Sequence, residues 1–119
     1  MLVISEAQYK ALSDDARGRS YERIGAYLRA NTPPAAKMDE RQLNEFIARQ
    51  ETNAAPYDLK SEREIAKWSW LALTVGEDFH KDSNVQAALR RPDIPSPGTR
   101  LDLLCKWIAD RMVIEGQKQ

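Results

Sequence analysis

The sequence predicts an all-α fold, a single domain over residues 1–119 built as a bundle of about five helices around a largely buried third helix. The first observation is a repeated helix-start signal, in which Ser or Asp caps a helix and Glu or Gln three residues later bonds back to the cap. It occurs four times, as Ser5 with Gln8, Asp39 with Gln42, Ser61 with Glu64 and Ser83 with Gln86. The second is that no β-branched run alternates for long enough to indicate a strand.

The first helix is predicted at residues 5–30 and ends before the pair Pro33-Pro34. One face of this helix carries Tyr9, Leu12 and Ala16, and a second face, about a quarter turn around the helix, carries Tyr21, Ile24 and Leu28. We therefore expect a bend or break between Ser13 and Gly18.

The second helix is predicted at residues 39–54, with Asp39 as its cap and Pro56 just beyond its end. The third is predicted at residues 61–76, and Gly76 is suited to its C-terminal cap. The third helix is apolar on almost every side, with one face formed by Ile65, Trp68, Leu71, Ala72 and Val75, and Ala66 and Leu73 opposite. A helix of this kind needs neighbours all round, so we expect the first, second and fifth helices to pack about it.

The fourth helix is predicted at residues 83–91, capped by Ser83 and ended by Pro92. The fifth is predicted at residues 99–115 and starts with Thr99. Its core face consists of Leu101, Leu104, Cys105, Ile108 and Met112, which recur at helical spacing.

The charge balance and the cysteine content indicate which partners and which cellular setting the protein has. Eighteen basic and eighteen acidic residues cancel, and residues 1–60 and 61–119 each hold nine of either sign. This balance argues against nucleic acid or an anionic membrane as the partner. A lone cysteine, Cys105, fits a reduced, cytoplasmic setting, and the N-terminus MLVISEAQYK has no signal-peptide or membrane-span pattern.

A nucleic-acid-binding regulator is kept as a secondary alternative, because arginine and tyrosine interleave in the first helix. The residues concerned are Arg17, Arg19, Tyr21, Arg23, Tyr27 and Arg29. They do not share one helix face, and acidic residues lie among them, so we do not expect nucleic acid to bind.

The segment GEDFHKDSN (76–84) places His80, the single histidine, among three acidic residues. A metal site there would need three or four converging ligands, and neither a second histidine nor the spacing of a calcium loop is present. We interpret the segment as a solvated loop anchored by a buried Phe79, and we predict no metal, cofactor or catalytic residue. An enzyme that uses this acidic loop with His80 is the rival from another class.

Two places are predicted to contact a partner protein. If Trp68 faces the core, then Trp70 is partly exposed beside Arg63 and Lys67, and an exposed Trp is a natural anchor. The simpler interpretation is that another helix of the chain covers Trp70. The second place is the loop PDIPSPG (92–98), where Pro95 and Pro97 stiffen the backbone and lower the entropy cost of binding. Here the simpler interpretation is a plain helix connection.

Four stretches carry a resemblance to a known group: VISEAQ, YLRAN, SEREIAKWSWLALTVGEDFHKD and PGTRLDLLCKWI. In them the chain resembles short helical proteins encoded beside spike and effector genes of bacterial type VI secretion systems. Within that group GEDFHKD resembles a Gly-x-Asp-Phe-x-x-Asp pattern. This implies structural roles for Gly76, Phe79 and Asp82 and makes His80 incidental.

The resemblance implies an accessory role without enzyme activity. One form is an adaptor or co-chaperone that holds an effector for loading, and the alternative is an immunity protein that neutralises a toxin. The expected partner is a secreted effector or toxin, or a spike component, and self-association is left open. The balanced charge favours the adaptor, because immunity proteins often carry strong charge complementary to their toxin.

Overall fold

The computed structural model describes the backbone of residues 6–117 and the side chains of residues 18–112, and this part of the chain contains no strand. Its helices are α1 (Glu6–Asn31), α2 (Pro33–Ala36), α3 (Glu40–Ala54), α4 (Glu62–Thr74), α5 (Ser83–Leu89) and α6 (Pro97–Gln117). Two 3₁₀ turns, η1 (Ala55–Tyr57) and η2 (Phe79–Lys81), follow α3 and precede α5. The predicted all-α class is confirmed.

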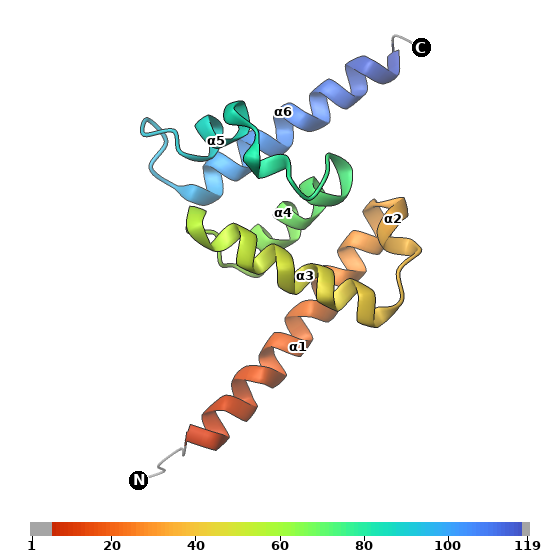
Figure 1. Ribbon diagram of the computed structural model, residues 1–119, viewed down its shortest axis with the longest axis vertical. Coiled ribbons are helices and arrows are strands. Elements are labelled where there is room, and N and C mark those ends of the chain that lie inside the picture. Colours follow the sequence, from red (N-terminus) through yellow and green to blue (C-terminus); the bar gives the residue numbers. More distant parts are fainter. Residues whose placement is uncertain (1–5, 118–119) are drawn as a thin grey trace.

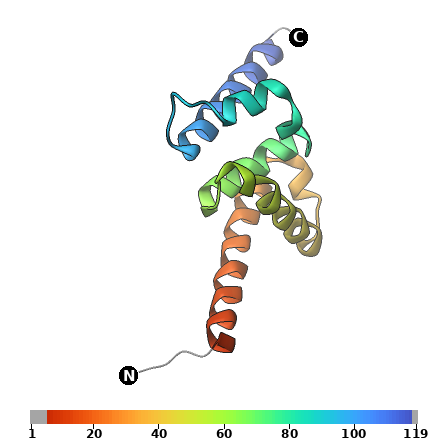
Figure 2. The same cartoon turned by 60° about the vertical axis from the view of Figure 1, so that its left-hand side comes forward.

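Helix α4 lies at the centre of the bundle, as predicted. Helices α1 and α3 pack on one side of it and α6 on another, while α5 packs on α6 (Figures 1 and 2). The Trp68 and Leu71 side chains of α4 have no exposed surface. They share one core with Leu28 of α1, Ile47 of α3 and Leu101 of α6.

The two helix starts that the sequence marks most clearly are both capping boxes. The Asp39 carboxylate accepts from the Gln42 amide at 2.8 Å, and the Gln42 side chain accepts from the Asp39 amide at 3.0 Å. Ser61 and Glu64 repeat the arrangement at the start of α4, with both bonds at 3.1 Å. The predicted cap at Ser5 lies outside the described residues.

Other helix starts differ from the prediction. The first helix ends before Pro33 as predicted, but Pro33 also begins a short helix, α2, that was not predicted, because proline suits the first turn of a helix and Thr32 caps that turn. Helix α5 is capped by Asp82, whose carboxylate accepts from the Asn84 and Val85 amides, and Ser83 is already helical. Helix α6 begins at Pro97, with the Ser96 hydroxyl accepting from the Thr99 amide at 3.4 Å.

Two further expectations are wrong. The break between Ser13 and Gly18 is absent, because α1 is continuous and this segment contains no proline to interrupt its hydrogen bonds. Val75 and Met112 are not core residues, since 51% and 48% of their surfaces are exposed. Val75 follows the last turn of α4. Met112 lies in the last two turns of α6, a helix whose C-terminal part extends beyond the rest of the bundle (Figure 1).

Polar contacts tie the helices together inside the apolar core. The Trp68 indole N–H donates to Gln50 Oε1 at 3.2 Å, and Gln50 Nε2 donates to Glu77 Oε1 at 2.9 Å. This chain of bonds joins α3, α4 and the loop after α4. Between α1 and α3 the Tyr21 hydroxyl donates to the Glu51 carboxylate. No helix within residues 6–117 combines the length and apolar character that crossing a bilayer requires.

Candidate functional site

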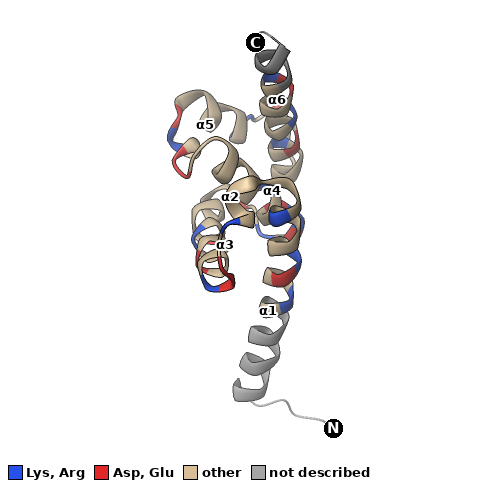
Figure 3. Cartoon of the chain, turned by 90° about the vertical axis from the view of Figure 1, so that its right-hand side faces the viewer, with Lys and Arg blue, Asp and Glu red and all other residues tan. Residues whose placement is uncertain are grey.

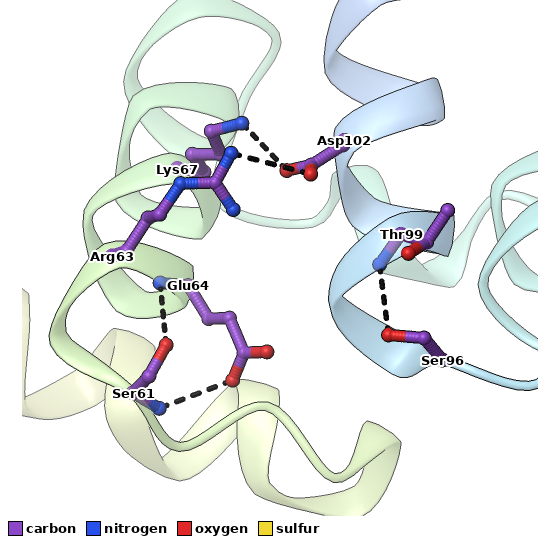
Figure 4. A network of polar contacts seen from close by, with 7 residues as sticks. All are labelled: Ser61, Arg63, Glu64, Lys67, Ser96, Thr99 and Asp102. Carbon is purple, nitrogen blue, oxygen red and sulfur yellow. Dashed lines mark hydrogen bonds and ion pairs between the residues drawn. The ribbon is translucent and has the colours of Figure 1, made fainter.

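The predicted contact residues Arg63 and Lys67 both face Asp102 of α6 (Figure 4). Lys67 Nζ lies 2.5 Å from one carboxylate oxygen of Asp102, and Arg63 Nη2 lies 3.2 Å from the other. Burial alone would raise the pKa of Asp102, but the hydrogen bonds from the two cations lower it below the usual value of a carboxyl group. Arg63 and Lys67 therefore fasten α4 to α6 within the chain.

The remaining predicted contact residues lie in two other places. Trp70 is half-buried and packs against the core cluster, which agrees with the simpler interpretation that the chain itself covers much of it. Pro95 is exposed in the loop before α6, and Pro97 is half-buried as the first residue of that helix. The loop is held by Arg100, whose Nε donates to the Ile94 carbonyl at 2.5 Å.

Most described contacts of the segment around His80 are structural, apart from an exposed surface ion pair between Asp78 and Lys81. Phe79 is buried as predicted, but the His80 ring is half-buried too, with its centroid 5.5 Å from that of Trp68. Glu77 accepts from Gln50 and Arg49, and Asp82 caps α5. In the part of the chain that the structure describes, no three His, Cys, Asp or Glu residues converge to hold a metal ion.

Cys105 is the one nucleophile that the sequence singled out. Burial raises the pKa of its thiol to about 11, so the thiolate that would react is scarce near neutral pH. The side chain packs against the core from α6, which agrees with the predicted structural role.

A groove between α5 and α6 is the most distinctive feature of the surface. Its volume is about 390 Å³, and its apolar walls are formed by Ala88, Ile94, Leu103, Leu104 and Trp107. Leu103 and Trp107 keep 45% and 47% of their surfaces exposed, which is unusual for large apolar side chains in the middle of a helix. Both lie four residues apart on α6 and so project from one face.

A second groove, of about 670 Å³, adjoins the first on the other side of Trp107. Val75 and Met112 are among its walls, and the Arg111 guanidinium lies 4.9 Å from the centre of the Trp107 ring. Among the described side chains five large apolar residues are exposed, and four of them line these two grooves. We call the four, Val75, Leu103, Trp107 and Met112, the Trp107 surface.

Sequence reasoning missed this surface and chose Trp70 instead. The available signal was that residues 99–115 are apolar on two faces, because Leu103 and Trp107 do not belong to the series Leu101, Leu104, Ile108. A second apolar face indicates either another covering helix or a binding surface. Only the arrangement of α5, which leaves that face open, distinguishes the two.

The arginines of α1 form no basic face in the described region. Arg23 Nε pairs with Glu62 at 2.7 Å, and Arg29 Nη2 donates to the Met38 carbonyl at 3.2 Å. Acidic and basic residues are mixed over the helices (Figure 3).

Comparison with known proteins gives one partial similarity. No protein-family model matches the chain, and no solved structure matches it. Over 87 residues, 73% of the chain, it is 32% identical to Protein SSH4 of Coccidioides immitis (strain RS). The chain spans only 17% of the length of that relative, so the similarity concerns a small part of a much larger protein.

Proposed function

We propose that the chain is a non-enzymatic accessory protein that binds another protein, of the adaptor or co-chaperone type, for a type VI secretion effector. The observation that carries the binding role is the Trp107 surface, an exposed apolar area beside a groove on an otherwise well-packed bundle. Exposed apolar patches of this kind mark interaction sites, and Trp is among the residues that most often dominate an interface.

The secretion role rests on the resemblance to proteins encoded beside type VI spike and effector genes. It agrees with a chain whose formal charge is balanced, because an adaptor holds its partner reversibly and needs no strong field to speed the encounter. An immunity protein, the alternative, must cover or distort a toxin's active site. Both roles need a protein-binding surface, so the choice between them depends on the effect on the partner.

Coexpression separates the two roles. The effector encoded beside this gene is produced with and without the protein, and the soluble effector and its toxicity are both measured. An adaptor raises the amount of soluble or spike-associated effector and leaves its activity intact. Rescue of cells from toxicity, together with inhibition of the purified toxin at equimolar ratio, would replace the adaptor with the immunity role.

A further inference from the structure

The Trp107 surface also has features that define the chemistry of its occupant. Resting on the proposed protein-binding function, we propose that this surface takes an amphipathic helix of the partner, with apolar anchors flanked by Asp or Glu. The proposal depends on the shape of the surface and on the charges at its edge.

The shape fits a helix. Leu103 and Trp107 lie one turn apart on one face of α6, and Met112 lies further along the helix and partly around it, so the surface turns about α6 as it extends about 13 Å along the axis. Because Trp107 lines both grooves, the apolar floor continues from one to the other along α6. A partner helix places side chains i, i+4 and i+7 on one face over a similar length, which is the usual arrangement for a helix bound in a groove.

The charges at the edge favour an acidic partner. Arg91 and Arg100 line the α5–α6 groove, and its lining contains no acidic residue. Arg91 is neutralised by Asp93, with Nη2 of the arginine 2.6 Å from the carboxylate. Arg100 is half-buried and, among the described residues, donates hydrogen bonds to the Ile94 and Leu89 carbonyls. The Asp93 carboxylate lies close enough to interact electrostatically with Arg100 but forms its hydrogen bonds with Arg91, so most N–H groups of Arg100 stay available to a further carboxylate.

Arg111 adds a second cation beside the adjoining groove, whose lining also contains one carboxylate, Asp82, which accepts hydrogen bonds from the first amides of α5. It stacks on Trp107 and forms no ion pair with any described side chain. A carboxylate from the partner could pair with Arg111 at the edge of the aromatic ring. Arg100 and Arg111 would then lie on either side of the apolar contact. Their positions would select a helix with acidic residues and would also fix its orientation in the groove.

A second copy of the chain fits this surface less well. A symmetric dimer through the Trp107 surface would repeat Arg100 and Arg111 on both sides of a two-fold axis. The added cations would repel each other without supplying a carboxylate, whereas an acidic helix from another protein satisfies them.

The test uses the full-length protein and a display library of 14-residue helices with all faces randomised. We expect selected helices to carry Leu, Phe or Trp at i, i+4 and i+7 and Asp or Glu beside them. The best helix, made as a labelled peptide, should bind at least ten times more weakly to Trp107→Ser and to Arg111→Glu. Tyr27→Ser, another exposed aromatic, and Arg41→Glu, which changes the net charge equally, should bind like the wild type.

Reversing the charge on both the peptide and the protein gives the most specific test of the ion pair. A peptide whose acidic residues are replaced by Lys should bind Arg111→Glu better than it binds the wild type. Selected helices without acidic residues, or binding that is indifferent to Trp107→Ser, would overturn the proposal. So would a dimer, seen by sedimentation, that dissociates in Trp107→Ser. If the effector binds the wild type and Trp107→Ser equally well, this inference fails and the proposed function stands. If the selected peptides bind as expected but the effector does not bind, the proposed function fails and the inference about the surface stands.

Discussion

At the scale of single residues, Trp68 contributes to the core in two ways, through aromatic packing and through a buried hydrogen bond. Its ring centroid lies 4.8 Å from that of Phe79 and 5.5 Å from those of Tyr57 and His80. Its indole N–H is satisfied by the buried Gln50. Substitution of Trp68 would remove both the aromatic packing and the hydrogen bond to Gln50, so we expect it to reduce the stability of the fold strongly.

Trp68→Ala should therefore lower the free energy of unfolding by about 3–5 kcal/mol, the usual cost of removing a buried aromatic side chain. Trp70→Ala should cost clearly less, because Trp70 is only half-buried. Urea denaturation followed by circular dichroism measures both. Equal and large losses would mean that Trp70 contributes to the core as much as Trp68 does.

His80→Ala distinguishes a structural histidine from an incidental one. If His80 lay in a solvated loop, the substitution would change the free energy of unfolding by less than about 0.5 kcal/mol. Because the His80 ring packs on Trp68, we expect a loss of about 0.5–1.5 kcal/mol. Chemical denaturation gives the value. Stoichiometric metal in the purified wild type that disappears in the variant would instead support the rival enzyme or metal site.

At the scale of helices, the contact between α4 and α6 depends on a shared carboxylate. Asp102 has a lowered pKa in the folded chain, so the unfolded chain binds more protons in acid and stability falls as pH falls through the folded pKa. The stabilisation is complete above the ordinary Asp value of about 3.9.

Asp102→Asn should remove this component of the pH dependence. Because the group is partly exposed, the effect on the free energy of unfolding between about pH 5 and about pH 2 should be at most about 1 kcal/mol. Thermal unfolding across that range measures it, with Asp110→Asn as the matched loss of a carboxylate from α6. A variant whose stability still declines with pH as steeply as the wild type would contradict the assignment.

Gly98 shows how closely the start of α6 approaches α4. A Cβ at this position would lie 2.7 Å from Glu64 Oε2, the side chain that completes the capping box with Ser61. Gly98→Ala should therefore destabilise the wild type by about 0.5–1 kcal/mol, in line with the loss of a cap. In a Glu64→Ala background the same change should be neutral or stabilising, since alanine favours the helix. Additive effects in this double-mutant cycle would show that the two residues do not interact.

Some helix starts could be predicted from the sequence, whereas others, and the Trp107 surface, could not. Asp39 and Ser61 were identified correctly because a capping box is a local pattern of two polar residues at fixed spacing. Asp82 and Ser96 were missed as caps because each lies near a residue of similar capping ability. Thr32 was missed because the pair Pro33-Pro34 was interpreted as the end of one helix and not as the first turn of another. The Trp107 surface was missed for another reason. Whether an apolar face is covered depends on a neighbouring helix, and no local pattern states where that neighbour lies.

At the scale of the whole molecule, α4 links two parts that differ in how well they are closed. The side formed with α1 and α3 buries most of its described apolar side chains, including Leu28, Phe46 and Ile47, and leaves Tyr27 exposed. The side formed with α5 and α6 leaves the Trp107 surface open, because α5 has only seven residues and covers little of α6. Exposed apolar surface is therefore concentrated on the side formed with α5 and α6, which is the side to which we assign the proposed binding role.

The most direct test of this account is the affinity of the purified protein for its proposed partner, a type VI secretion effector, measured by isothermal titration calorimetry with wild type, Trp107→Ser and Tyr27→Ser. Loss of a central aromatic anchor typically costs 2 kcal/mol or more, so Trp107→Ser should bind about thirtyfold or more weakly. Tyr27→Ser should bind like the wild type, and circular dichroism should show both variants folded. Equal affinities for the wild type and a folded Trp107→Ser variant would contradict the claim that the protein works through this surface.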